Sequence, residues 1–485
     1  MATVLTVAAS LLVAGAAGSA QADPKPAETP AVPSVTTFPR PEDPDAPLRA
    51  ASEEAKKQNK PVPVEAAFTE TSRVWAYPDG HFTTQSYGGP AQLKQADGSW
   101  AWLDPTLVEQ DGILKPKLAK AGVQFSLGGD KPFVSMERSK GQKFALSWPT
   151  ELPRPEVSGN VARYVDAAGK GADLVVTALP TGFQHDVVLR ERPTGPLEFR
   201  LPVETTGAEL TLTKSGGLSL VSPKGKTVMS APTPRMWDNA DPAGAGGPRR
   251  ETKVKTSVET AGDQTVLVLK PDPKWLADPA TRYPVTVDPT TTLGVTQEIS
   301  IRSPNRGTGP GWVGRWSATP STGETINRAL MAFDTTPIAG RQVVKSTMQL
   351  TLLYDVVGCS QYQGIAAQRI TSAWVANNTS WANQPSVTGE GRSLIDPCVL
   401  PRPKGSVWSW DLTTMTQLWA SGTPNRGLML SLTSESPVPK NYGEDFLFWS
   451  QGMGQNVPKL SVDWVLPPEI PTVTAESIDS ISGND

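Results

Sequence analysis

The chain has 485 residues, a formal net charge of −3, 47 prolines, 15 tryptophans, two cysteines and two histidines. Only 19% of the residues are charged, against roughly 25% in ordinary globular proteins, and the many prolines favour turn-rich β structure over helix bundles. Because the charges nearly cancel, no field would attract nucleic acid or anionic lipid, so we expect no nucleic-acid partner. His81 and His185 lie far apart in the sequence, and we expect no metal ion and no cofactor.

The first 22 residues have the pattern of an export signal. Residues 1–22 contain no charged side chain, hold an apolar stretch at 4–16 and finish with Ala-Gln-Ala, which predicts a signal peptide with an A-x-A cleavage site. The usual basic start is lacking, which leaves a start codon further upstream as an alternative. A membrane anchor is the rival interpretation, but the apolar run is short for a span of about 20 residues. We therefore expect an extracellular product, secreted or associated with the cell wall, that begins near Asp23.

Proline dominates the next segment. Residues 23–63 contain ten prolines in 41 positions and a single aromatic residue, Phe38. A segment of this composition cannot bury enough apolar surface to fold. We expect an extended linker, interrupted only by a short helix over residues 50–60.

Residues 64–290 alternate apolar and polar positions and are divided by turn signals. The stretch Arg-Val-Trp-Ala-Tyr at 73–77, followed by Pro-Asp-Gly, predicts a strand and then a turn. No long amphipathic helix competes with this pattern, so we expect an N-terminal β region of one or two antiparallel domains. Further strands are predicted at residues 143–148, 173–178, 185–190, 208–213, 265–270 and 283–287.

Residues 291–466 repeat the β pattern and contain nine of the 15 tryptophans. Short strands at this spacing are typical of a β-sandwich or jelly roll. The predicted fold class is therefore all-β, with a C-terminal jelly-roll-like sandwich preceded by one or two antiparallel β domains. Residues 467–485 are predicted to form a linker or tail. Strands of the sandwich are predicted at residues 328–333, 345–353, 366–370, 406–411, 427–432, 446–449 and 459–464.

Both cysteines, Cys359 and Cys398, fall inside the predicted sandwich. An exported chain passes through an oxidising compartment, so we expect one disulfide, with two separate buried thiols as the alternative. The disulfide would close a loop of about 40 residues and stabilise the fold by roughly 3–4 kcal/mol on the chain-entropy estimate.

Three stretches of the sandwich form a recognisable set. They are Asn-Arg-Ala-Leu-Met-Ala-Phe-Asp at 327–334, Thr-Ser-Trp-Ala-Asn-Gln-Pro at 379–385 and Trp-Asp-Leu-Thr at 410–413. In these stretches the region resembles the DNRLRE domain family, β-sandwich modules of secreted and surface proteins. Upstream, Trp-Ala-Tyr-Pro-Asp-Gly at 75–80 and Arg-Tyr-Pro-Val-Thr-Val-Asp-Pro at 282–289 are similar to the segment that precedes this domain in actinobacterial surface proteins.

The resemblance implies a module that binds polysaccharide or cell-wall glycan. It also implies the N-terminal part of a larger RHS/YD-repeat surface protein, of the wall-associated polymorphic-toxin type, with a covalent continuation into a repeat or toxin region, since this chain has neither. We expect a secreted, non-catalytic surface or adhesion module with no membrane span after signal removal. A free-standing carbohydrate-binding protein is the alternative.

Catalytic motifs are weak throughout the chain. Residues 309–314 fit G-x-G-x-x-G, but Pro310 and Trp312 stand where a phosphate loop needs open backbone. We expect no enzymatic activity. A glycoside hydrolase or polysaccharide lyase is the third hypothesis, because a catalytic carboxylate pair has no local signature. Its candidate residues are Asp411, Glu444 and Asp445.

A sugar-binding site would need flat aromatic faces surrounded by directed hydrogen-bonding groups. Arg302 and Arg315 are the candidate hydrogen-bond donors to an acidic polysaccharide. Core packing is the alternative role for the tryptophans. The tryptophans in or near predicted loops, which are the candidate stacking residues, are Trp312, Trp316, Trp374 and Trp408.

Overall fold

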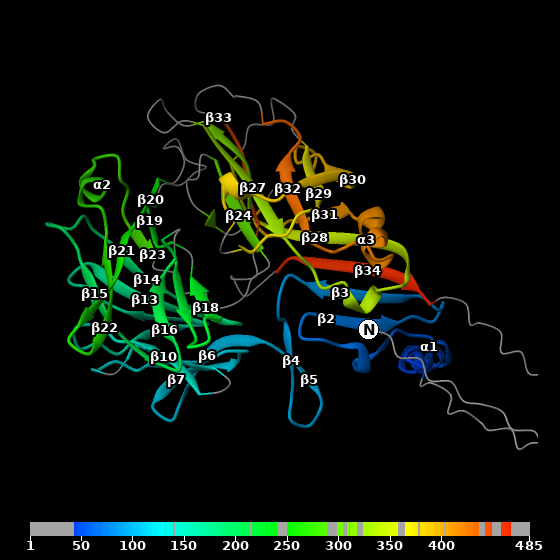
Figure 1. The fold of residues 1–485 in the computed structure, drawn as a ribbon, viewed down its shortest axis with the longest axis horizontal. Coiled ribbons are helices and arrows are strands. Elements are labelled where there is room, and N and C mark those ends of the chain that lie inside the picture. Colours follow the sequence, from blue (N-terminus) through cyan, green and yellow to red (C-terminus); the bar gives the residue numbers. More distant parts are fainter. Residues whose placement is uncertain are drawn as a thin grey trace, which may run out of the picture. The chain divides into compact units, whose positions relative to one another are not determined.

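The computed structural model confirms the all-β class: antiparallel sheets carry most of the described residues, and the helices are few and short (Figure 1). The signal peptide, most of the proline-rich segment, Cys359 and the predicted tail at 467–485 lie outside the described residues. The structure describes residues 43–130, 132–138, 141–213, 216–231, 233–239, 250–288, 298–303, 308–309, 311–317, 324–356, 364–376, 379–401, 403–435, 442–448 and 457–466.

The large sheet contains both the first and the last strand of the described chain. Its strand order is β1-β2-β3-β34-β28-β33-β26-β27-β32-β29-β30, with β24, β25 and β31 paired at its sides. In that order the strands are β1 (Val62–Pro63), β2 (Ser72–Ala76), β3 (Phe82–Tyr87), β34 (Lys459–Val465), β28 (Gln342–Val356), β33 (Tyr442–Phe448), β26 (Trp312–Ser317), β27 (Glu324–Met331), β32 (Leu428–Leu432), β29 (Ile365–Ile370), β30 (Val387–Ile395), β24 (Glu298–Arg302), β25 (Thr308–Gly309) and β31 (Val407–Asp411).

Four smaller sheets are formed by residues between β3 and β24. One contains β21 (Lys255–Ala261), β22 (Gln264–Lys270), β15 (Phe199–Thr206), β10 (Gln142–Leu146), β9 (Val134–Arg138), β8 (Gly122–Ser126), β7 (Ile113–Leu118) and β6 (Asp104–Gln110). The next contains β11 (Glu156–Ser158), β12 (Val161–Tyr164), β13 (Ala172–Leu179), β14 (Gly182–Leu189), β23 (Val285–Asp288), β19 (Arg235–Trp237) and β20 (Glu251–Lys253). The smallest two are β16 (Glu209–Leu212), β17 (Leu218–Val221) and β18 (Thr227–Ala231), and the hairpin of β4 (Gln92–Lys94) and β5 (Trp100–Trp102).

The helices are short connections between strands. Within the described ranges, none is long and apolar enough to cross a membrane. They are α1 (Ala46–Gln58), α2 (Pro273–Ala277) and α3 (Thr413–Ala420), and the 3-10 turns η1 (Glu65–Ala67), η2 (Thr336–Ile338) and η4 (Trp381–Asn383).

The pairing of β3 with β34 joins the two ends of the described chain (Figure 1, blue beside red). Phe82 lies opposite Trp464, and their rings stack with centroids 4.7 Å apart at an interplanar angle of 18°. Trp464 Nε1 also donates a hydrogen bond to Thr84 Oγ1 at 2.8 Å. Residues 72–87, which the sequence groups with the N-terminal β region, thus belong to the large sheet. The domain boundaries at residues 63, 290 and 466 stay predictions.

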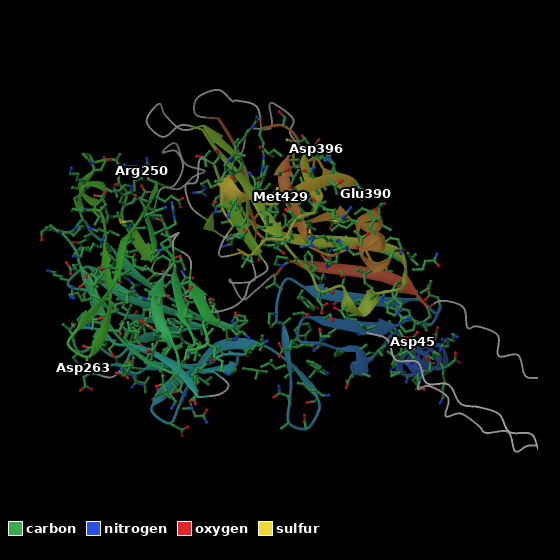
Figure 2. The ribbon with its side chains drawn as sticks, viewed as in Figure 1. Asp45, Arg250, Asp263, Glu390, Asp396 and Met429 are labelled. Carbon is green, nitrogen blue, oxygen red and sulfur yellow. The ribbon has the colours of Figure 1, made fainter. Side chains whose placement is uncertain are left out.

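The segment from Asp45 onward contains the short helix expected at residues 50–60, but this helix, α1, begins earlier, at Ala46, so residues 46–49 are helical and not extended linker. Three residues at helical spacing, Leu48, Ser52 and Ala55, are buried on one face of α1. Asp45, at the start of the helix in Figure 2, forms an ion pair with Arg341. Proline composition was misleading because the first turn of a helix tolerates proline.

Three clusters of buried apolar side chains form the core. One is built from the smaller sheets between residues 107 and 287, and a second from the large sheet together with α1, β2 and α3. A third, smaller cluster contains Ile299, Leu330 and Met429, the last of which is labelled in Figure 2. The α1–β3 segment therefore contributes to the same core as β28 and β34.

We predict that Trp464→Ala lowers the free energy of unfolding by about 3–5 kcal/mol, because it removes a fully buried ring and its hydrogen bond to Thr84. Val344→Ala is the matched control, since that side chain is 58% exposed. Urea unfolding followed by tryptophan fluorescence measures both. Equal stability of the two variants would contradict the closing role of the β3–β34 pair.

Candidate functional site

Trp408 does not present its ring to a ligand, which corrects its prediction as a stacking residue. It is fully buried, and its ring centroid lies 5.2 Å from that of Phe446 and 5.4 Å from that of Phe448. Its Nε1 donates to the carbonyl oxygen of Pro401 at 2.7 Å. The cause is strand alternation, which turns Trp408 and Trp410 together toward the core.

The other candidate tryptophans lie in separate surroundings. Trp374 is half-buried, packs against the third core cluster and donates from Nε1 to the carbonyl oxygen of Arg426 at 2.7 Å. Trp312, also half-buried, is the first residue of β26, and its backbone N–H donates to Ser300 Oγ at 2.7 Å. Trp316 is in the same strand, and its side chain lies outside the described residues. The described rings do not assemble one stacking surface.

The two candidate arginines make contacts inside the protein. Arg315 is 1% exposed and lies opposite Glu444 in the register of β26 with β33. Arg302 donates from Nε to Asn327 Oδ1 at 2.7 Å and forms an ion pair with Glu251. Both positions therefore serve internal contacts and not the surface contacts expected of a polysaccharide site.

Arg302 belongs to a row of residues that crosses four strands of the large sheet. Arg302 lies opposite Asn327, Asn327 opposite Gly314, and Gly314 opposite Asp445. Because Gly314 has no side chain, Asn327 Nδ2 reaches across β26 and donates to Asp445 Oδ2 at 2.7 Å. The missing side chain of Gly314 thus leaves room for the hydrogen bond between Asn327 and Asp445.

The row continues into strands of the N-terminal β region. Glu251 Oε1, which accepts from Arg302, also accepts from Arg235 Nη2 at 2.9 Å. Arg235 lies opposite Asp288, and the side chain of Asp288 is hydrogen-bonded to that of Asp186. The residues of this polar chain, as we call it, are Asp186, Asp288, Arg235, Glu251, Arg302, Asn327 and Asp445.

The polar chain has a carboxyl group with a raised pKa at each end. Burial raises the pKa of Asp445 to about 7, against the opposing effect of Arg302, and burial likewise raises the pKa of Asp186. A pKa near neutrality suits general acid–base catalysis. Asp445, however, is 7% exposed and lies in the interior of the sheet, so the arrangement links strands inside the fold.

The two histidines differ in their access to solvent. His185 is fully buried near Phe133 and Phe183, and burial lowers its pKa to about 3, so it stays neutral. His81 is on the turn between β2 and β3 with its side chain 28% exposed, and Nδ1 lies 2.5 Å from Asp79 Oδ1. Across the described ranges, no cluster of three or more His, Cys, Asp or Glu side chains is placed to hold a metal ion.

The carboxylates proposed for glycan cleavage do not form a described pair. Asp411 accepts hydrogen bonds from the backbone and hydroxyl of Thr413, which hold the pKa of Asp411 below its usual value. Asp445 belongs to the polar chain, and the side chain of Glu444 lies outside the described residues. Cys398 is disulfide-bonded, while Cys359 lies outside the described residues.

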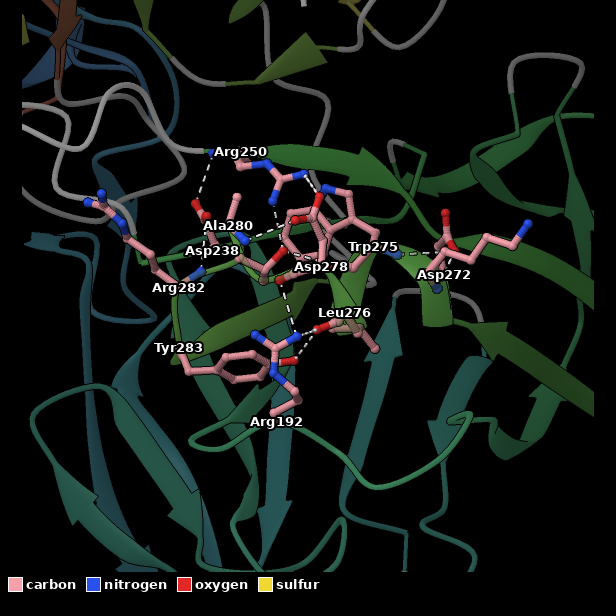
Figure 3. A network of polar contacts seen from close by, with 12 residues as sticks. Arg192, Asp238, Arg250, Asp272, Trp275, Leu276, Asp278, Ala280, Arg282 and Tyr283 are labelled. Carbon is pink, nitrogen blue, oxygen red and sulfur yellow. Dashed lines mark hydrogen bonds and ion pairs between the residues drawn. The ribbon is translucent and has the colours of Figure 1, made fainter. Parts of the chain in front are cut away.

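A second polar network surrounds α2 and the segment that follows it (Figure 3). Arg250 donates to Asp278 Oδ2 at 2.7 Å and to Thr281 Oγ1 at 3.0 Å, and its guanidinium lies 5.5 Å from the ring of Trp275. On the other side of the loop, Arg192 donates to the carbonyl oxygens of Leu276 and Asp278 at 2.8 and 3.1 Å. Most of these hydrogen bonds end on backbone carbonyl oxygens or on the carboxylate of Asp278, so the network holds α2 and the segment after it in place.

No family model matches the chain. Among curated proteins, it is 24% identical over 451 residues to the tRNA nuclease WapA of Bacillus subtilis strain 168, which covers 87% of this chain and 18% of that protein. The tRNA3(Ser)-specific nuclease WapA of Bacillus spizizenii is also 24% identical, over 87% of this chain and 19% of that protein. The chain thus spans about a fifth of the length of these relatives.

These names correct several expectations. They contradict the resemblance to DNRLRE and RHS-type surface modules. They also contradict the expectation of a non-catalytic protein without enzymatic activity, because the relatives are named as nucleases. The expectation of a polysaccharide partner and no nucleic-acid partner is contradicted, because the relatives are named for tRNA. The carbohydrate-binding and glycan-cleaving alternatives are contradicted for the same reason. The physical reason is that net charge averages over the whole chain, and acid–base catalysis leaves no fixed local motif.

A partly exposed group of aromatic side chains lies between residues 68 and 102, and no motif in the sequence marks it. A signal other than a motif was present, because Trp-Ala-Trp at 100–102 and Trp75 on the outward positions of β2 leave large rings on a strand face that alternation does not bury.

We predict that Asp445→Asn flattens the pH dependence of stability. Between about pH 4 and pH 7 the native protein holds a proton on Asp445 that the unfolded chain has released, so the wild-type protein loses stability as the pH rises through this window. The variant should lower that slope by at most about 1.4 kcal/mol per pH unit, the limit for one proton. Urea unfolding at several pH values measures it, and an unchanged slope would show that Asp445 is not a buried neutral acid.

Proposed function

We propose that this protein acts on tRNA as a nuclease of the kind named WapA. The observation that supports the proposal is the similarity to these nucleases over 87% of the chain. A match of this length spans both the strands of the N-terminal β region and the large sheet. The chain corresponds to 18–19% of the length of the relatives, so their nuclease activity is proposed for this chain from their names.

Cleavage of an RNA strand requires groups that take a proton from the attacking oxygen and give one to the leaving oxygen. Of the two imidazoles in the sequence, His185 is buried and His81 is accessible. Asp79 Oδ1 contacts His81 Nδ1, and the ring stacks on Tyr77 with centroids 4.2 Å apart, so the imidazole is held in one orientation. We therefore propose His81 as the acid–base group, with Asp79 as the residue that positions it.

The test is the incubation of the purified protein with total tRNA, followed by denaturing gel electrophoresis, over pH 5–8 and with and without added Mg²⁺. We predict defined cleavage products, and a loss of about 100-fold or more in rate for His81→Asn. Asp79→Asn should keep part of the rate but shift its pH profile, because the carboxylate acts through the imidazole.

A matched control is Asp111→Asn, which changes a carboxylate on the turn between β6 and β7 with its side chain 74% exposed and should cleave at the wild-type rate. Intact tRNA under every condition would overturn the proposed function. Cleavage at the wild-type rate by His81→Asn would remove His81 while leaving the nuclease activity in place.

We also propose that the protein is exported, on the basis of the uncharged apolar segment and the Ala-Gln-Ala sequence within residues 1–22. The intact mass of the product in the culture medium of the producing cells should correspond to a chain that begins near Asp23. A product found inside the cells that still begins at Met1 would contradict export.

A formal net charge of −3 limits how this protein can bind tRNA. Contacts between basic side chains and phosphates usually supply most of the affinity for nucleic acid, and they depend strongly on salt. A chain without an overall basic field needs a further source of affinity. Stacking of bases on aromatic rings is the source that does not depend on net charge.

A further inference from the structure

We propose that a partly exposed group of aromatic side chains on β2, β3, the segment before β2 and the β4–β5 hairpin binds unpaired bases of single-stranded RNA by stacking, with Trp102 as its exposed ring. This aromatic platform consists of Phe68, Arg73, Trp75, Tyr87, Trp100 and Trp102. The inference deepens the proposed action on tRNA and rests on it for the identity of the ligand. The surface itself is independent of the candidate acid–base group at His81.

Strand alternation places Arg73 and Trp75 of the platform on the face of the large sheet that points away from its core. Along β2, Ser72, Val74 and Ala76 are buried, and the apolar two of them belong to the core shared with β28 and β34. Arg73 and Trp75 occupy the alternate positions and point away from that core. The platform side of β2 is therefore fixed by the packing of its other side.

The rings touch one another but are not enclosed by the core clusters. The centroid of Phe68 lies 5.9 Å from that of Trp75 and 6.3 Å from that of Trp100, and Tyr87 meets Trp102 edge to face at 5.5 Å. Trp102 is 47% exposed, while the other rings are half-buried. The exposed face of Trp102 at the edge of this ring cluster is where a planar ligand can be received.

Arg73 ties the two parts of the platform together. Its guanidinium carbon lies 3.9 Å from the ring centroid of Trp102 and 5.2 Å from that of Phe68. Arg73 Nε donates to Gln92 Oε1 at 2.5 Å, and Gln92 Nε2 in turn donates to the carbonyl oxygens of Thr69 and Ser72. The guanidinium is thus held over the rings of Trp102 and Phe68, and the exposed part of Trp102 is the surface that a base can reach.

These contacts favour a ligand that stacks over one that must be hydrogen-bonded. Directed hydrogen bonds, which a sugar requires, would have to come from groups such as the Gln92 amide, and that amide is 1% exposed and already bonded to backbone and to Arg73. An exposed aromatic ring, in contrast, stacks on any nucleobase. Lys94, directly opposite Trp100 in the hairpin, adds a positive charge for the neighbouring phosphate.

The platform thus supplies what net charge does not. Base stacking is tolerant of sequence and acts on unpaired nucleotides, such as those of tRNA loops, and not on the stacked bases of a duplex. We expect the protein to prefer single-stranded RNA to double-stranded RNA of the same length.

The experiment measures fluorescence anisotropy of a labelled 15-nucleotide polyuridine RNA and of a labelled RNA duplex, titrated with the full-length protein. We expect binding of the single strand, weaker binding of the duplex, and about tenfold weaker single-strand binding by Trp102→Ala. Trp102→Phe keeps a ring and should recover most of the affinity. Val399→Ala, a change to a side chain that is 76% exposed, is the surface control.

No binding of the single strand, or equal binding by Trp102→Ala and the wild type, would overturn the platform. Tighter binding of the duplex than of the single strand would also overturn it. Displacement of the labelled single strand by an added proline-rich peptide would do the same. Cleavage of tRNA with unchanged affinity in Trp102→Ala would remove the platform and leave the proposed function. RNA binding that depends on Trp102 without any cleavage of tRNA would support the platform and overturn the nuclease proposal.

Discussion

The pairing of β3 with β34 is the interaction on which the large sheet depends. It places a strand from near the start of the described chain between β2 and the last strand, and it closes over a buried pair of rings, Phe82 and Trp464. Through it, α1 and β2 share a core with β28 and α3. Because the inner face of β2 is committed to that core, Arg73 and Trp75 are turned to the outside, and the aromatic platform is a direct consequence of the closure.

The polar chain is the second constraint on the fold, and it acts through electrostatic energy instead of apolar packing. Burying a charge is costly unless the charge is paired or neutralised. Here Arg302 and Arg235 are paired through Glu251, and the carboxyl groups at the ends have raised pKa values that let them take up protons. The contacts of Arg302 and Arg235 with Glu251 link strands of two sheets.

The composition of this protein and the names of its relatives lead to different expectations about nucleic acid. Near-neutral charge argues against nucleic acid, whereas the relatives are named for tRNA. The two are compatible where affinity comes from stacking, since aromatic rings carry no net charge and contribute nothing to a charge count. A single imidazole without a motif becomes a chemical candidate only through the contacts of Asp79 and Tyr77 that hold it.

The sequence by itself determined the all-β class and the positions of many strands, because alternation and turn residues are properties of short stretches. Strands such as β13, β22 and β34 can be read from five or six neighbouring residues. Tertiary structure alone decided which strands pair across 380 residues, that Trp408 faces the core, and that Gly314 lets Asn327 reach Asp445. Those outcomes depend on the register between distant strands, and register is set by packing that no local pattern records.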